Sequence, residues 1–134
     1  MGILDKMFKS EREIAKQEIV EVPWHQLNKM EQLNAIEEES KSRPVAILKH
    51  STRCGISRMV LKQFESSYGL KEDADIKLYF LDLLSHREIS NEIAARFGVQ
   101  HESPQLIVLR DEKVVHQASH QSIDAADLSQ FVQN

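Results

Sequence analysis

The sequence predicts one α/β domain in which a central mixed sheet of about five strands is flanked by helices. Strand-like and helix-like segments alternate along most of the chain, which favours parallel strands joined by right-handed helical crossovers. Two strand-like segments near the C-terminus are separated only by a short turn, which predicts an antiparallel hairpin at one edge. The 134 residues, 41% of them hydrophobic, suffice for one core. We expect residues 1–17 to form an N-terminal arm or short helix and residues 18–134 to form the domain.

The first half of the chain predicts strands and helices in alternation. Residues 18–22 have strand composition and stop at Pro23. Residues 27–41 carry apolar side chains near helical spacing. The continuous apolar run 44–49 follows a helix breaker, and its length predicts a buried central strand. Residues 56–68 then carry an apolar stripe with helical period and predict the next helix.

The second half continues the alternation and ends with the hairpin. Residues 76–82 alternate enough to predict a strand, and Ser85 with Glu88 three residues later predicts a capping box. The helix that follows should end at Gly98. The remaining elements are strands at 105–109 and 113–116 around a turn at Asp111 and Glu112, and a last helix that Asp124 caps and that runs through Val132.

Composition excludes several classes of function. The formal net charge is −4, whereas nucleic-acid binding usually needs a basic face. No run of residues is long and apolar enough for a secretory signal or a membrane span, so we expect a cytoplasmic protein with no nucleic-acid or membrane partner. One cysteine cannot form an internal disulfide. The six histidines show no metal-ligand spacing, so we expect no bound metal.

Cys54 is the candidate nucleophile. It falls between the buried strand and the helix that begins near residue 56, at the edge where open α/β sheets place their ligands. The free N–H groups and the dipole of a helix N-terminus favour an anion, and therefore favour a thiolate over a thiol. Arg53 can add positive charge, and the hydroxyl of Ser57, one turn later, can face the sulfur. The alternative is a buried cysteine that acts as a small hydrophobic residue, which the polar flanking residues disfavour.

Other residues near this segment are weaker candidates. His50 could pair with Cys54, although a solvent-exposed loop histidine is the favoured interpretation. Ser103 and Pro104 stand directly before the strand 105–109, where a cis peptide bond would create a sharp turn. His101 is close to Ser103-Pro104 in sequence and is a weaker candidate for lining a substrate groove there.

The order of elements, the cysteine at this helix start and the later Ser103-Pro104 resemble the thioredoxin superfamily. Its members carry Cys-x-x-Cys, whereas Cys54-Gly55-Ile56-Ser57 has a serine in the second position, so no resolving thiol is present. More narrowly, the run from Thr52 to Ser57, together with the segment from Ser103 to Leu109, resembles the monothiol bacilliredoxins. That resemblance implies a thioredoxin-like fold. It also implies removal of bacillithiol from S-thiolated cytosolic proteins.

The resemblance also implies a role for each matching residue. Cys54 would be the catalytic nucleophile and Ser57 would support its thiolate. Arg53, Gly55, Ser103 and Pro104 would contact substrate, with the backbone of Ser103 pairing with it and with Pro104 as the cis proline. No cofactor is implied beyond a low-molecular-weight thiol, such as bacillithiol, as co-substrate.

Two other functions remain open from the sequence. The run from Cys54 to Ser57, preceded by Arg53, resembles the Cys-Gly-Phe-Ser motif of monothiol glutaredoxins and differs from it by one residue. That resemblance implies an iron–sulfur cluster carrier. Those proteins bind their small thiol through a Gly-Gly-Asp stretch that has no counterpart after Val115. The third possibility is a redox-inactive thioredoxin-like interaction module, in which Cys54 is incidental.

Overall fold

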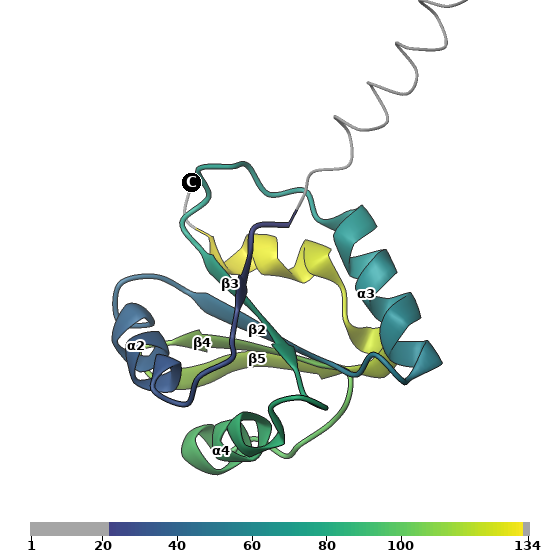
Figure 1. Cartoon of the computed structure of the whole chain (residues 1–134). Coiled ribbons are helices and arrows are strands. Elements are labelled where there is room, and N and C mark those ends of the chain that lie inside the picture. The colour runs from purple at the N-terminus through teal and green to yellow at the C-terminus, as the bar shows by residue number, and fades with distance from the viewer. Residues whose placement is uncertain (1–21, 133–134) are drawn as a thin grey trace, which may run out of the picture.

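The computed structural model, which describes residues 22–132, has a five-stranded mixed sheet, as predicted. The strand order is β1-β3-β2-β4-β5 (Figure 1). The strands are β1 (Trp24–Gln26), β2 (Val45–His50), β3 (Lys77–Asp82), β4 (Gln105–Arg110) and β5 (Lys113–Ser119). Strand β2 pairs parallel with β3 and antiparallel with β4, so the two strand directions meet at the centre of the sheet.

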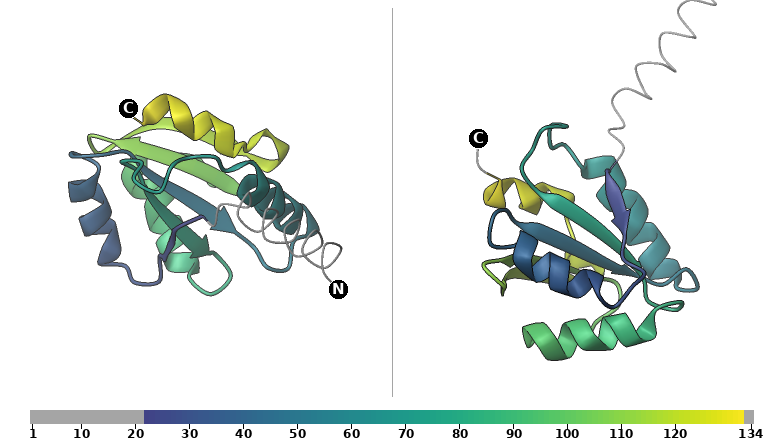
Figure 2. Two further views of the ribbon diagram at one scale, coloured as in Figure 1. Left: turned by 90° about the horizontal axis from the view of Figure 1, so that it is seen from above. Right: turned by 60° about the vertical axis from the view of Figure 1, so that its left-hand side comes forward.

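Helices cover both faces of this sheet. They are α2 (Gln32–Glu39), α3 (Gly55–Ser67), α4 (Arg87–Phe97) and the 3-10 helices η1 (His120–Ser122) and η2 (Ala125–Phe131). Helices α2 and α4 lie on one face, and α3 and η2 lie on the other (Figure 2). Helix α2 is shorter than the predicted 27–41, because the Gln32 side chain accepts the N–H groups of Asn28 and Lys29 and closes a turn before it. In the described part of the chain, no helix combines the length and hydropathy needed to cross a bilayer.

The central strand β2 is buried on both faces. Ala46 and Leu48 belong to the core beneath α3, whereas Val45 and Ile47 belong to the core beneath α2 and α4. The two sets alternate because successive side chains of a strand point to opposite faces. Both faces are covered, which explains why residues 44–48 are all apolar.

The first strand of the described residues, β1, begins after Pro23, so the strand predicted to end at this proline is tested only at Val22. Val22 lies outside any strand, while residues 18–21 and the predicted N-terminal arm lie outside the described residues. Proline has no N–H to give to a strand ladder, so pairing with β3 starts only beyond it. Trp24 then anchors the strand by stacking on Phe64 of α3, with ring centroids 5.5 Å apart.

The predicted capping box at the start of α4 is wrong. The helix begins at Arg87, and its N-cap residue is His86, whose side chain makes no capping bond. The Ser85 hydroxyl instead donates to Asp82 Oδ2 over 3.0 Å, because that carboxylate stands at the end of β3 within reach. The predicted stop at Gly98 is confirmed by its left-handed backbone, with φ at 64°.

The C-terminal elements follow the prediction. Strands β4 and β5 form an antiparallel hairpin, and its turn residues Asp111 and Glu112 have positive φ angles of 53° and 65°. Such angles match the twist of the flanking strands. The Asp124 side chain accepts the N–H of Ala126 over 3.0 Å and caps the last helix as expected, although that helix is of the 3-10 type.

Candidate functional site

The loop after β2, the loop before β4 and the segment after β5 meet at one end of the sheet. Lys49 near the end of β2 stands opposite Gln105 at the start of antiparallel β4, so the loop after β2 lies beside Ser103-Pro104. The peptide bond between Ser103 and Pro104 is cis, as considered from the sequence. The N–H of His120, at the start of η1, donates to the Pro104 carbonyl over 3.1 Å. This end of the sheet therefore gathers the segments that the sequence analysis singled out.

Cys54 is the N-cap residue of α3. Its backbone is extended, with φ −97° and ψ 122°, and its carbonyl accepts the N–H of Arg58 over 3.1 Å. The side chain is half-buried and makes no capping hydrogen bond, while the neighbouring Arg53 and Gly55 are exposed. The predicted position of the thiol at the amino end of a helix is therefore found. The dipole and free N–H groups of such a helix end stabilise an anion there.

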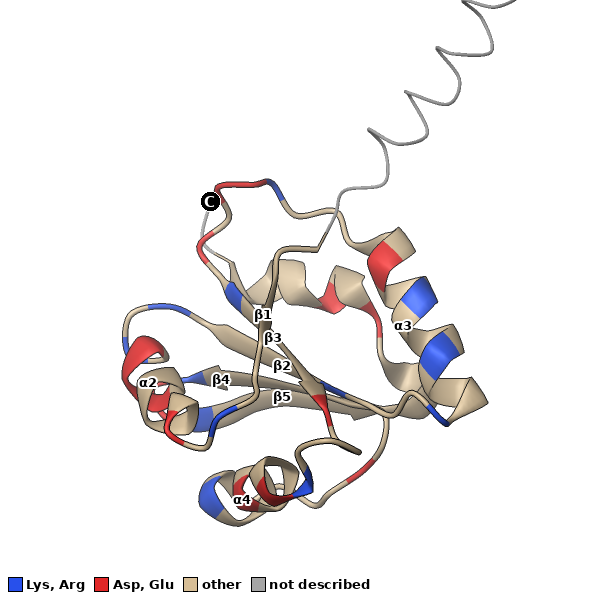
Figure 3. Ribbon diagram, in the orientation of Figure 1, with Lys and Arg blue, Asp and Glu red and all other residues tan. Residues whose placement is uncertain are grey.

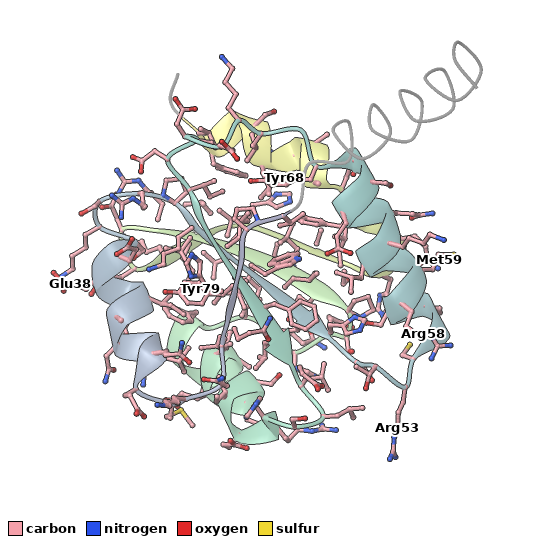
Figure 4. All side chains as sticks on the ribbon, turned by 45° about the horizontal axis from the view of Figure 1, so that its top comes forward. Glu38, Arg53, Arg58, Met59, Tyr68 and Tyr79 are labelled. Atoms are coloured by element: carbon pink, nitrogen blue, oxygen red, sulfur yellow. The ribbon has the colours of Figure 1, made fainter. Side chains whose placement is uncertain are left out.

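Cations surround the start of α3. Arg53 projects outward from the loop, and Arg58 and Met59 lie beside it on the helix (Figure 4). The guanidinium of Arg58 donates to the carbonyl of Thr52 over 3.1 Å, which ties the loop to the helix. Helix α3 also carries Lys62, which is exposed, and Figure 3 shows the basic stretches of this helix in blue. Within residues 22–132 these three cations form no ion pair, so their charge is available to a bound anion.

Ser57 is fully buried, and its hydroxyl has two partners. Its oxygen accepts the N–H of Ser51 over 3.0 Å and lies 2.9 Å from Nδ1 of His50. His50 is therefore not the solvent-exposed loop residue that the sequence favoured. It is the last residue of β2, 4% exposed, on the same face as α3. The expectation that the Ser57 hydroxyl supports the Cys54 thiolate stays a prediction.

The environment of His50 favours its neutral form. Burial lowers the pKa of His50, and this outweighs the opposing effect of Asp82, which stands opposite it at the end of β3. A neutral imidazole can accept the Ser57 proton at Nδ1 or donate one there, according to its tautomer. Sequence reasoning could not find this pair, because it depends on which way the last residue of β2 points.

We expect Ser57→Ala to reduce stability more than it reduces catalysis. The substitution removes the partner of the Ser51 N–H and of the His50 ring in a buried place, which should cost about 1–3 kcal/mol of unfolding free energy. Urea unfolding measures that loss, and Ser66→Ala on the exposed face of α3 should change stability by less than about 0.5 kcal/mol. The rate of thiol exchange should fall only a few-fold. A fall as large as that caused by removing Cys54 would place Ser57 in the chemical step.

A second polar cluster lies at the same end of the sheet, on the opposite face. Lys49 is fully buried, and its ammonium lies 3.2 Å from Nδ1 of His101. His101 thus turns at least one ring nitrogen inward, toward the sheet. A signal was present in the sequence, since Lys49 is a charged residue inside a run that predicts a buried strand. Among the described residues, no three His, Cys, Asp or Glu side chains are grouped so that they could hold a metal ion.

Comparison with known proteins defines the class. A structure described as a candidate oxidoreductase with a thioredoxin fold is 33% identical to this chain. It aligns over 80% of this chain and 91% of its own length, with a TM-score of 0.66. Thioredoxins of Fasciola hepatica and Schistosoma mansoni are 21% and 17% identical, with TM-scores of 0.58 and 0.60. The alignments cover 79% and 81% of this chain, and 93% and 92% of theirs. The fold is thioredoxin-like, and the protein is of the thiol oxidoreductase class.

The family can be stated more narrowly. The model of the monothiol bacilliredoxin BrxC family matches residues 25–128, which include the Cys54 motif and the Ser103-Pro104 segment. The chain belongs to this family. The resemblance inferred from the motifs is therefore confirmed, and so is the predicted fold class.

Proposed function

We propose that this protein removes a low-molecular-weight thiol, bacillithiol, from S-thiolated cytosolic proteins by attack of Cys54. The observation that carries the proposal is the placement of the chain's one cysteine at the N-cap of α3, half-exposed, with Ser57 where a second thiol would stand. A nucleophile without a resolving partner suits transfer of a thiol group from one molecule to another. Membership of the bacilliredoxin family supports bacillithiol as that group.

The chemistry consists of two thiol–disulfide exchanges. In the first, the Cys54 thiolate attacks the small-thiol sulfur of a protein–S–S–R disulfide, and the target protein leaves as its thiolate. Cys54 then carries R as a mixed disulfide. In the second, a thiolate from solution attacks the sulfur of R, forms a new disulfide with it and leaves Cys54 reduced. Each step breaks one S–S bond and forms one, so no external oxidant is needed.

The loop before α3 offers contacts for the small-thiol part of the substrate. Arg53, together with Arg58, favours a mixed disulfide whose small-thiol half is anionic. A Cβ atom added at Gly55 would meet only the end of the Arg58 side chain, 3.9 Å away. The fold therefore does not require glycine at this position, and the absence of a side chain leaves room beside Cys54.

The protein part of the substrate would contact two other features. The backbone of Ser103 has no backbone partner within residues 22–132, so it can pair with an extended segment of the target. Pro104 is buried, and its carbonyl accepts the N–H of His120. On α3, directly after Cys54, Ile56 and Met59 are exposed by 42% and 45%, and they give an apolar surface for the target to cover.

A panel of mixed disulfides tests the proposal. One carrier protein, modified separately with bacillithiol, glutathione and coenzyme A, is mixed with the reduced chain, and intact mass follows the group gained by Cys54. We expect transfer of bacillithiol to be the fastest, because membership of the bacilliredoxin family favours it. Equal rates for the three donors would contradict selectivity for bacillithiol while leaving thiol exchange intact. Absence of transfer from all three would contradict the proposed function.

A further inference from the structure

Lys49 is a buried cation placed beneath the end of the sheet that carries Cys54 and Ser103-Pro104. The alternation along β2 directs it to the face covered by α2 and α4, away from Cys54 and α3. Its partner across the sheet is Gln105 of β4, which is also fully buried. The neighbouring pairs on this face, Val45 with Leu109 and Ile47 with Ile107, are apolar. One polar pair thus ends an otherwise apolar row of β2–β4 pairs, at the end of the sheet next to Ser103-Pro104.

The polar pair holds the loop that leads to Ser103-Pro104. The ammonium of Lys49 donates to the carbonyl of Ser90 in α4 over 3.2 Å. It also lies 3.2 Å from Nδ1 of His101. The Gln105 amide donates to the carbonyl of Gln100 over 2.9 Å, and its oxygen accepts the N–H of Glu102 over 3.3 Å. Gln100, His101 and Glu102 are therefore each in polar contact with Lys49 or Gln105.

Burial of the Lys49 ammonium lowers the stability of the fold. Within the described residues, no carboxylate lies within ion-pair distance of Lys49, and burial lowers its pKa to about 8. The pKa of His101 is also lowered, by burial first and then by Lys49 and Arg87, against an opposing effect of Glu102. A neutral His101 ring can accept from the ammonium. A hydrophobic residue of similar volume would avoid the desolvation of a charge, so stability alone does not account for a lysine here.

We propose that Lys49 is a positioning residue, which fixes the loop of residues 99–104 so that Ser103-Pro104 presents its backbone to the substrate. This proposal rests on the proposed function. It assigns a part in that function to Lys49, which lies on the face of the sheet opposite to α3. Lys49 would act through His101 and the loop, without touching the thiol or the substrate.

Lys49→Met tests the proposal because it should move stability and activity in opposite directions. Removing the buried charge should raise Tm, by on the order of 5 °C. Loosening the loop should lower the rate of thiol transfer from an S-thiolated protein by about tenfold, since small misplacements of positioning groups are costly. Alkylation of Cys54 by iodoacetamide, which does not need the Ser103-Pro104 backbone, should keep its rate. Lys113→Met, at an exposed position of β5, is the matched control and should change none of the three.

The possible outcomes separate this proposal from the proposed function. If the unmodified chain transfers no thiol, the proposed function fails before Lys49 is tested. If the unmodified chain and Lys49→Met transfer at the same rate, the positioning role is wrong. The same conclusion follows if alkylation slows in step with transfer, because Lys49 would then act on the sulfur rather than on the loop.

The pH dependence of stability gives an independent readout. The pKa of Lys49 is about 8 in the fold against 10.5 for the ordinary side chain, so the unfolded chain binds more protons between these values. The stability of the unmodified chain should therefore rise with pH across this interval, relative to Lys49→Met. The gap in Tm between the two should be widest at or below pH 8 and should close toward pH 10.5. A gap that does not depend on pH would show that folding does not lower the pKa of Lys49, which would contradict a destabilising buried charge at this position.

Discussion

Replacing Cys54 by alanine is expected to lower the rate of thiol transfer by at least about a thousandfold, to the uncatalysed level. The reason is that the chain has one cysteine, so no other sulfur can form the mixed disulfide with the small thiol. Intact mass measures the effect directly. The unmodified chain should gain one small-thiol group after mixing with an S-thiolated protein, and Cys54→Ala should keep its original mass.

The fold should survive this substitution, which makes the result interpretable. Cys54 is half-buried and makes no capping hydrogen bond, so its side chain contributes little to the start of α3. We expect the unfolding free energy to change by less than about 1 kcal/mol, as circular dichroism during urea unfolding can check. Thiol release by a folded Cys54→Ala protein would contradict the nucleophilic role of this sulfur and favour a binding module.

The parts of the fold that were predicted correctly depend on local signals. The buried strand β2 was found because its run of apolar residues is bounded by Pro44 and a polar loop. The end of α4 was found because Gly98 adopts a left-handed backbone that few other residues tolerate. The position of Cys54 follows from the apolar run of β2 and the helical stripe of residues 56–68, since a strand end and a helix start bracket it.

The parts that were missed depend on contacts between segments distant in sequence. Ser85 has the composition of an N-cap, but Asp82 at the end of β3 takes its hydroxyl. His50 looked like a loop residue, and only the pleat of β2 shows that it points to Ser57. Lys49 meets His101 only after β2 and β4 pair and α4 covers the sheet, so no local pattern could reveal the contact.

Ser57→Cys is expected to convert the monothiol site into one that releases its small thiol without help. Positions 54 and 57 are the N-cap and the third residue of the first turn of α3, a spacing at which side chains are neighbours. Once Cys54 carries the small thiol R, the introduced thiol should attack Cys54 Sγ, expel R as its thiolate and close a disulfide. The attacking thiol must lose a proton, and His50 Nδ1, 2.9 Å from the present hydroxyl oxygen, can accept it.

Mass and added thiol distinguish the two reactions. Without a second thiol in solution, the unmodified chain should remain as the mixed disulfide. Ser57→Cys should instead lose R and become two hydrogens lighter than its reduced form, and its release should be faster than any bimolecular exchange at millimolar thiol. Ser66→Cys adds a thiol on the exposed face of α3, twelve residues from Cys54 in sequence, and should release nothing. Adding His50→Phe to Ser57→Cys should slow release, because the proton acceptor is gone. If Ser57→Cys keeps R bound to Cys54, position 57 does not face the sulfur, and a supporting role for Ser57 is excluded as well.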